Sequence, residues 1–278
     1  YIAKKDSLQN KITVYNDEAI KNMGANWPAL SSFISSMYYT SLSQVLEMIY
    51  ETTRAYNFWA LDTKDMADVL GGNPLKITYA ELINAQNNIT LDYKNAVAAF
   101  GTACSYFPAH QREPGIFYPF NAMQLDFLKD NSEAMVGIPN VTRATVISKN
   151  PFAGRCNIRI TKVRCWLTGA KSTSSTYKNI IINITQQGTE KITSRDDDVY
   201  NFQHDTRKIS FIYDLETGVI ETDGDFGVHY PGEGTNYALY GPFATWQIEI
   251  DPACQDYIDL SDVTDAKLEF FGTCYSFN

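Results

Sequence analysis

The chain has 278 residues, of which 44% are hydrophobic and 20% charged, which is typical of a soluble globular protein and excludes a disordered one. Its net charge of -9 is concentrated after residue 208, where 13 acidic side chains accompany a single basic one, Lys267, and this argues against nucleic acid as a partner. No apolar run approaches the roughly 20 residues of a transmembrane helix, so no membrane span is expected.

Two long helices are expected in a helical arm formed by residues 1–110. Over residues 28–62, apolar side chains recur at i, i+3 and i+4, and after Pro28 the segment contains neither Gly nor Pro. This pattern predicts an amphipathic helix. A short segment then ends at Gly71, and a second long helix begins with the capping-box pattern Thr78–Glu81 and reaches about Cys104. The two helices are predicted to form a hairpin, and their stripe of aromatic side chains is interpreted as a packing surface.

From residue 111 on, the apolar residues alternate with a period of two. Segments with this pattern are separated by Gly, Asp, Asn and Pro clusters: RCNIRITKVRCWL, NIIINITQQG, RKISFIYDLETG, FATWQIEI and DAKLEFFGTCYSF. In the first segment the phase shifts between Ile160 and Val163, which predicts a β-bulge. With no helix-length segment expected between strands, residues 111–278 are predicted to form an antiparallel β-sandwich or jelly-roll-like domain, and the whole chain an α+β fold.

The sequence offers no residues in catalytic spacing. There is no nucleophile motif and no Gly-rich phosphate loop. Glu249, Asp251 and Glu269 could supply the carboxylate pair of a glycosidase, but strand alternation predicts that they face solvent. We therefore expect a protein that is not an enzyme and that needs no cofactor.

A calcium site is a weaker alternative. The segment SRDDDVYNFQHD offers carboxylate oxygens, the ligands that Ca²⁺ prefers, from Asp196, Asp197, Asp198 and Asp205. Their spacing matches no EF-hand, and three consecutive Asp residues usually form a solvated turn. Asp259 and Asp262, in the Asp-rich stretch near the C-terminus, are likewise interpreted as turn and strand-entry residues.

The five Cys residues show no zinc-binding spacing and are interpreted as reduced and structural. Cys254 and Cys274 could pair only if their strands are neighbours.

The best candidate for a recognition surface is the loop HYPGEGTNY with its surroundings. It combines tyrosines with acidic residues, a composition suited to binding a partner protein with a basic surface. The predicted partner-binding residues are Tyr230, Tyr237, Tyr240, Asp223, Asp225 and Glu233.

The C-terminal stretch also contains a more specific pattern. Its elements are Pro242-Phe243, Thr245-Trp246 followed by Ile248 and Ile250, and Leu260-Ser261-Asp262-Val263. This pattern resembles the end of the A subunit of insecticidal toxin-complex (Tc) toxins. Upstream, RITKVRCWLTGA is similar to the strand that enters that domain, and the helical arm is similar to the helices leading into it from the channel stalk. The resemblance spans roughly residues 25–276.

The resemblance implies a non-enzymatic assembly module, on which the cocoon-forming B component docks, and a secreted protein. Pore formation is not carried over from the family to this chain, because the family's channel-forming hairpin has no counterpart in these residues. Two alternatives stay open: a carbohydrate-binding β-sandwich, with or without Ca²⁺, and a structural protein that self-assembles through its long helices.

Overall fold

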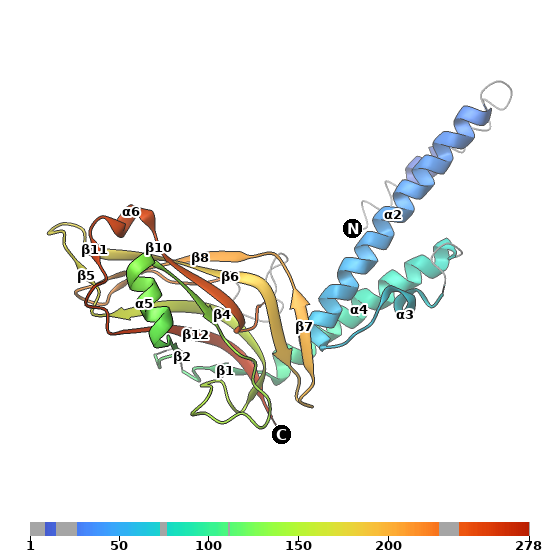
Figure 1. Cartoon of the computed structure of the whole chain (residues 1–278). Coiled ribbons are helices and arrows are strands. Elements are labelled where there is room, and N and C mark those ends of the chain that lie inside the picture. The colour runs from blue at the N-terminus through green and yellow to red at the C-terminus, as the bar shows by residue number, and fades with distance from the viewer. Residues whose placement is uncertain (1–8, 15–26, 73–76, 111, 228–238, 278) are drawn as a thin grey trace. The chain divides into compact units, whose positions relative to one another are not determined.

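The computed structural model describes residues 9–14, 27–72, 77–110, 112–227 and 239–277, with the backbone alone for 27–30 (Figure 1). It contains helices and antiparallel sheets, so the α+β prediction is confirmed. The chain divides into two compact units, Tyr1–Ala55 with Lys64–Leu91, and Tyr56–Thr63 with Asp92–Asn278. Each long helix therefore contributes to both units, whereas the sequence suggested a border after residue 110.

The predicted helices are present, and their ends lie within two residues of the predicted ones. They are α2 (Trp27–Ala60), α3 (Met66–Leu70) and α4 (Tyr79–Ala103). Gly71 ends α3 in the left-handed conformation, with φ at 66°. At the start of α4 the Thr78 N–H donates to Glu81 Oε2 at 2.7 Å, and the Glu81 N–H donates to Thr78 Oγ1 at 3.3 Å, which confirms the capping box.

In the first unit the two long helices bury a narrow stripe. Ile49, Leu82 and Ile89 are buried, and Gln86 Nε2 lies 3.4 Å from Met48 Sδ. Several aromatic side chains on α2 stay exposed: Phe33, Tyr38, Tyr39 and Tyr50. None of the helices in the described part of the chain combines the length and apolar character needed to span a membrane.

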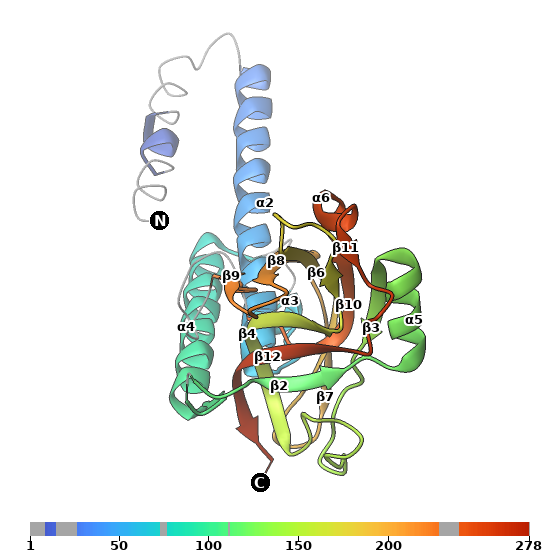
Figure 2. The same ribbon diagram turned by 90° about the vertical axis from the view of Figure 1, so that its left-hand side faces the viewer.

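The second unit contains two larger antiparallel sheets (Figure 2). In one sheet, β12 (Asp265–Ser276) pairs along one edge with β4 (Arg155–Thr168) and along the other with β1 (Ser105–Phe107) and β2 (Ile116–Pro119). The other sheet has the order β3-β10-β6-β8-β9, and β7 also pairs with β6. The bounds are β3 Glu133–Gly137, β6 Asn179–Thr193, β7 Val199–Gln203, β8 Arg207–Asp214, β9 Ile220–Thr222 and β10 Phe243–Ile250.

Small elements complete the second unit. Strands β5 (Lys171–Ser172) and β11 (Ile258–Asp259) form a two-stranded sheet, and α6 spans Pro252–Gln255. Helix α5 (Ala122–Asn131) lies beside β3 (Figure 2). The expectation of no helix between strands is wrong here, because α5 joins β2 to β3. Its capping box, Asn121 with Gln124, was a signal in the sequence.

One aromatic-rich core lies between the two larger sheets. The predicted core residues of β10 are all buried: Phe243, Trp246, Ile248 and Ile250. Trp246 packs edge-on against Phe270, with ring centroids 5.4 Å apart, and its Nε1–H donates to Pro242 O at 2.9 Å. The indole is thus buried with its polar group satisfied. The five Cys residues are free, and Cys254 does not pair with Cys274.

The predicted bulge in β4 is confirmed at Thr161. Ile160 pairs with Gly272 and Lys162 with Phe271, so Thr161 has no partner in the ladder with β12. Its hydroxyl donates to Phe271 O at 3.3 Å. The extra residue lets apolar side chains on both sides of it face the core.

The bulge brings two backbones close together at Gly272. A Cβ at this position would lie 2.0 Å from Arg159 O and 3.0 Å from Ile160 Cα. We expect Gly272→Ala to lower the free energy of unfolding by about 2 kcal/mol, because the strands must separate to admit the methyl group. Urea unfolding measures this. Gly137→Ala is the control, since a Cβ there meets nothing within 4 Å; equal losses in both variants would contradict the prediction.

Candidate functional site

The structure describes three of the six predicted partner-binding residues. Tyr230, Glu233 and Tyr237 lie outside the described residues. The other three lie on the two flanks of that segment: Asp223, Asp225 and Tyr240. We call Asp223–Gly227 the first anchor and Leu239–Gly241 the second anchor, because contacts with other residues of the second unit hold both segments in place.

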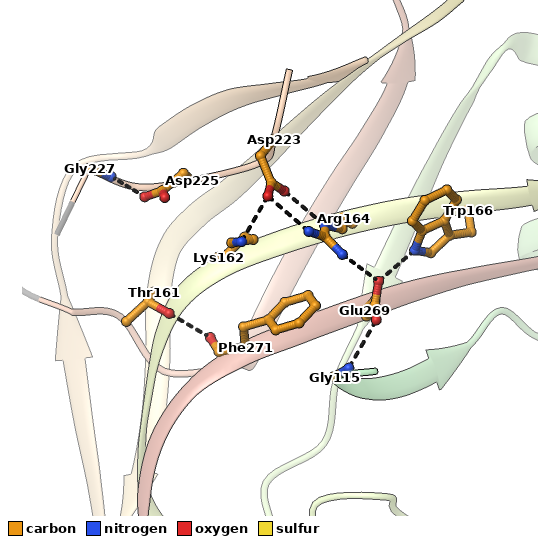
Figure 3. A network of polar contacts seen from close by, with 10 residues as sticks. All are labelled: Gly115, Thr161, Lys162, Arg164, Trp166, Asp223, Asp225, Gly227, Glu269 and Phe271. Atoms are coloured by element: carbon orange, nitrogen blue, oxygen red, sulfur yellow. Dashed lines mark hydrogen bonds and ion pairs between the residues drawn. The ribbon is translucent and has the colours of Figure 1, made fainter. Parts of the chain in front are cut away.

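Asp223 holds the first anchor through two basic side chains of β4 (Figure 3). Lys162 Nζ lies 2.8 Å from Asp223 Oδ2, and Arg164 donates to both carboxylate oxygens, from Nε at 2.8 Å and from Nη2 at 2.9 Å. Such a two-pronged guanidinium–carboxylate contact fixes orientation as well as distance. The Asp223 carboxylate is therefore engaged within the domain.

The backbone of the first anchor adds to this attachment. The Val163 N–H donates to Gly224 O at 2.8 Å, and the Phe226 N–H donates to Thr161 O at 3.1 Å, so the anchor runs beside β4 at its bulge. Asp225 Oδ1 accepts from the Gly227 N–H at 2.7 Å (Figure 3).

Glu269 belongs to the same network, and the prediction that it faces solvent is wrong. Its side chain is buried, with Oε2 accepting from Trp166 Nε1 at 2.7 Å and Oε1 accepting from the Gly115 N–H at 2.9 Å. Arg164 Nη1 lies 3.5 Å from Oε2, between the two carboxylates (Figure 3). Strand alternation correctly assigned Glu269 to the face away from the core, but the Trp166 ring and the backbone at Gly115 cover that face.

The charges of this network shift the pKa of Asp223. Burial alone would raise it, but the hydrogen bonds and charges of Arg164 and Lys162 outweigh burial and lower the pKa to about 2. The carboxylate is therefore charged over the physiological pH range.

The second anchor is held by a separate buried cluster. Leu239 packs with Phe58, Phe100 and Ile192. Tyr240 O accepts from the Ile160 N–H at 2.6 Å. The Gly241 N–H donates to Glu190 Oε2.

The Tyr240 ring stacks on His204, with centroids 4.2 Å apart. His204 Nε2 lies 3.8 Å from Glu190 Oε1. Burial raises the pKa of Glu190 to about 8, against the opposing charge of Arg159 and the bond from Gly241, and burial lowers the pKa of His204.

Arg159 lies in the same region, fully buried among aromatic rings. Its guanidinium carbon is 4.0 Å from the centroid of Phe58 and 5.3 Å from that of Trp59. It donates to Phe58 O and, at 3.0 Å, to Asn157 Oδ1. Burial lowers the pKa of Arg159 to about 10, so it stays charged at neutral pH. Within the second unit this cation ties the end of α2 to β4.

A hollow of about 440 Å³ lies near this cluster, within the second unit. Its walls combine Trp59, Phe100 and Tyr275 with the polar side chains of Asp92 and Asn95. None of the predicted partner-binding or metal-binding residues lines it.

The Asp-rich segments form turns. In the described part of the chain, no group of three or more His, Cys, Asp or Glu side chains is placed to hold a metal ion. Ser194 Oγ accepts from the N–H groups of Asp196 and Asp198 at 3.2 Å each, and Asp197 Oδ1 accepts from the Arg143 N–H at 2.8 Å. The calcium alternative at Asp196–Asp198 and Asp205 therefore gains no support.

The C-terminal aspartates also bond locally, as the turn interpretation predicts. Asp259 Oδ1 accepts from the Ser261 N–H at 2.9 Å, and Asp251 Oδ1 accepts from the Ala253 N–H at 3.0 Å at the start of α6. The Asp262 carboxylate pairs with Lys171 at the surface.

The acidic surplus after residue 208 is partly neutralised inside the domain. Within the described residues, basic side chains of 151–208 form six ion pairs with acidic side chains of the segment after residue 208: Lys162–Asp223, Arg164–Asp223, Arg164–Glu269, Lys171–Asp262, Lys178–Glu216 and Lys208–Glu249. The acidic segment is therefore not an unopposed face, although residues 151–278 together still carry 11 basic and 18 acidic side chains.

No protein-family model matches the sequence, and no curated protein matches it significantly. Among solved structures, the chain is similar to one described as the cryo-EM structure of Yersinia pseudotuberculosis TcaA-TcaB, with 12% sequence identity and a TM-score of 0.35. The match covers 99% of this chain and 16% of that chain. A similarity this low carries no argument about function by itself.

The lowered pKa of Asp223 predicts an acid-dependent contribution to stability. Because the folded-state pKa is about 2, below the ordinary 3.8, the contribution is complete above the ordinary value and is lost as the pH falls towards the folded-state value. We expect Asp223→Asn to lower the unfolding free energy at neutral pH, with the difference from wild type shrinking as the pH approaches about 2. Urea unfolding across this pH range measures it, with the exposed Asp265→Asn as control; a pH-independent difference would contradict it.

Proposed function

We propose that the second unit is a non-enzymatic protein-interaction module whose partner contacts lie between its two anchors. The observation that carries this proposal is the attachment of both anchors to the domain, by Asp223 on one flank and by Tyr240 and Gly241 on the other. Proteins commonly place recognition residues on loops whose ends a rigid scaffold holds. In this proposal Tyr230, Glu233 and Tyr237 contact the partner.

The anchors then have a different role from the one predicted for them. Asp223, Asp225 and Tyr240 hold the flanks of the recognition segment, because their described polar and ring contacts are made within the domain. The proposed partner, following the resemblance to Tc toxin A subunits, is a protein with a basic surface like the cocoon-forming B component.

The test is binding of the full chain to a purified Tc toxin B component by biolayer interferometry. We expect the double variant Tyr230→Ala/Tyr237→Ala to weaken binding by at least about tenfold, because tyrosines often dominate interface energies. Tyr177→Ala is the matched control, since Tyr177 is exposed elsewhere in the second unit. Equal effects of the two changes, or no binding by wild type, would count against the proposal.

Ionic strength gives a second readout of the same experiment. With an acidic domain and a basic partner, association should slow as salt rises, while dissociation changes less. Binding that salt leaves unchanged would contradict the electrostatic part of the proposal. Binding to a glycan array that a chelator abolishes would favour the carbohydrate alternative.

A second candidate function is self-association through the helices of the first unit. The observation that favours it is the exposure of Tyr38, Tyr39 and Tyr50 on α2. Large exposed apolar patches often mark interfaces.

Multi-angle light scattering of the full chain tests self-association. We expect a mass above that of one 31.3 kDa chain, and a shift towards the single-chain mass in Tyr38→Ser/Tyr39→Ser. Met123→Ser in α5, at another exposed apolar residue, serves as control. A single-chain mass for wild type at all concentrations would rule this function out.

A further inference from the structure

The buried Glu190 side chain has only one of its two oxygens bonded. Oε2 accepts from the Gly241 N–H, whereas Oε1 has no hydrogen-bond partner in the described part of the chain. A carboxylate removed from water needs donors for both oxygens, because its charge is otherwise left unsolvated. The site therefore favours the protonated acid over the carboxylate.

His204, which follows β7, does not supply the missing donor. Its Nδ1 lies 2.8 Å from Asp205 O, which can only accept, so Nδ1 carries the proton. Its Nε2 lies 3.3 Å from the side-chain amide nitrogen of Gln186, whose oxygen accepts from the Gly188 N–H. Nε2 is thus an acceptor whose single lone pair faces the Gln186 amide, so it has no proton to donate to Glu190.

Arg159, on β4, is a cation whose charge opposes the raised pKa of Glu190, but it gives Oε1 no hydrogen bond. Its guanidinium donates to Phe58 O and Asn157 Oδ1, and its third nitrogen, Nη1, is buried without a hydrogen-bond partner in the described part of the chain. Tyr275 on β12 is a further titratable group that interacts with the charge of Arg159.

The strand neighbours of Glu190 are apolar. They are Phe202 on β7 and Ala244 on β10. Among the described groups around Glu190, the Gly241 N–H is thus the one that donates a hydrogen bond to the carboxyl group.

We propose that Glu190 is a proton-controlled latch for Leu239–Gly241, closed while its carboxyl group is protonated and released as that group ionises. In the closed state Oε2 holds the Gly241 N–H, and Tyr240 rests on the neutral His204 ring. Ionisation places a charge on a carboxylate whose Oε1 receives no hydrogen bond from the described protein groups, and the charge is relieved when the segment lifts and water reaches the carboxylate. The latch is a property of the second unit and does not depend on which partner the protein binds.

The direction of the pH dependence follows from the proton balance. The closed state holds its proton up to the folded-state pKa of about 8, whereas an opened, solvated Glu190 would lose it near the ordinary value of 4.5. Between these values opening releases one proton, so its equilibrium constant rises about tenfold for each pH unit. The stabilising contribution of Glu190 is complete at acid pH and is lost as the pH rises.

Hydrogen exchange of the Gly241 amide in the full chain tests the latch. Wild type and Glu190→Gln are compared at each pH from about 5.5 to about 7.5, so that the intrinsic pH dependence of exchange cancels. The Gln side chain keeps an oxygen for the Gly241 N–H and cannot ionise. We expect the protection of Gly241 in wild type to fall by about tenfold per pH unit relative to the variant.

Glu269→Gln is the matched control, because Glu269 is also buried but has both oxygens bonded. It should lower stability without changing the pH dependence at Gly241. The latch would be overturned if the protection of Gly241 depended on pH equally in wild type and Glu190→Gln. It would also be overturned if Glu269→Gln altered that pH dependence as Glu190→Gln does. If Glu190→Gln does not fold, carboxyl ¹³C titration of wild type decides instead: a Glu190 signal already ionised at about pH 6 overturns the proposal, and one that titrates near the folded-state value supports it.

Discussion

The bulge at Thr161 determines which way the polar side chains of β4 point, and both anchors depend on it. On the N-terminal side of the bulge, Ile160 faces the core and Arg159 the opposite side. An unbroken alternation would then have put Lys162 and Arg164 into the core. The extra residue reverses the phase, so Val163 is buried and the two basic side chains reach Asp223. The same strand therefore serves two different polar clusters on its outer face.

The two buried glutamates of the second unit differ in how many of their oxygens accept hydrogen bonds. This number, more than the depth of burial, decides whether the charged form is stabilised. Glu269 has donors on both oxygens and a guanidinium nearby, so it connects β12 to β4 and to the backbone at Gly115. Glu190 is just as buried but has a donor on one oxygen only. A fully satisfied network rigidifies a structure, whereas a buried acid that lacks a donor pays a cost when it ionises. The first network suits a fixed anchor, and the second suits an adjustable one.

The sequence predicted the elements with strong periodicity and missed what depends on tertiary cover. The long helices, the capping box at Thr78, the bulge and the buried face of β10 all follow from spacing, which is a local property. The burial of Glu269 does not, because alternation separates two faces of a strand without saying whether a second layer covers the outer one. Arg159 was missed for the same reason. It stands opposite Ile158 and Ile160 on its strand, and nothing local shows that the aromatic end of α2 closes over it.

Charge is a further case in which linear order misleads. Along the chain a basic stretch precedes an acidic one, which suggests two faces of opposite sign. In the second unit the strands of the two stretches are neighbours, since β4 pairs with β12 and β6 with β10. Opposite charges therefore meet between neighbouring strands and between the loops that join them. Their pairing stabilises the sheet locally and reduces the electrostatic field of the acidic segment at longer range. Net charge can then speed the approach of a basic partner, but the choice of partner must rest on side chains that the domain does not use internally.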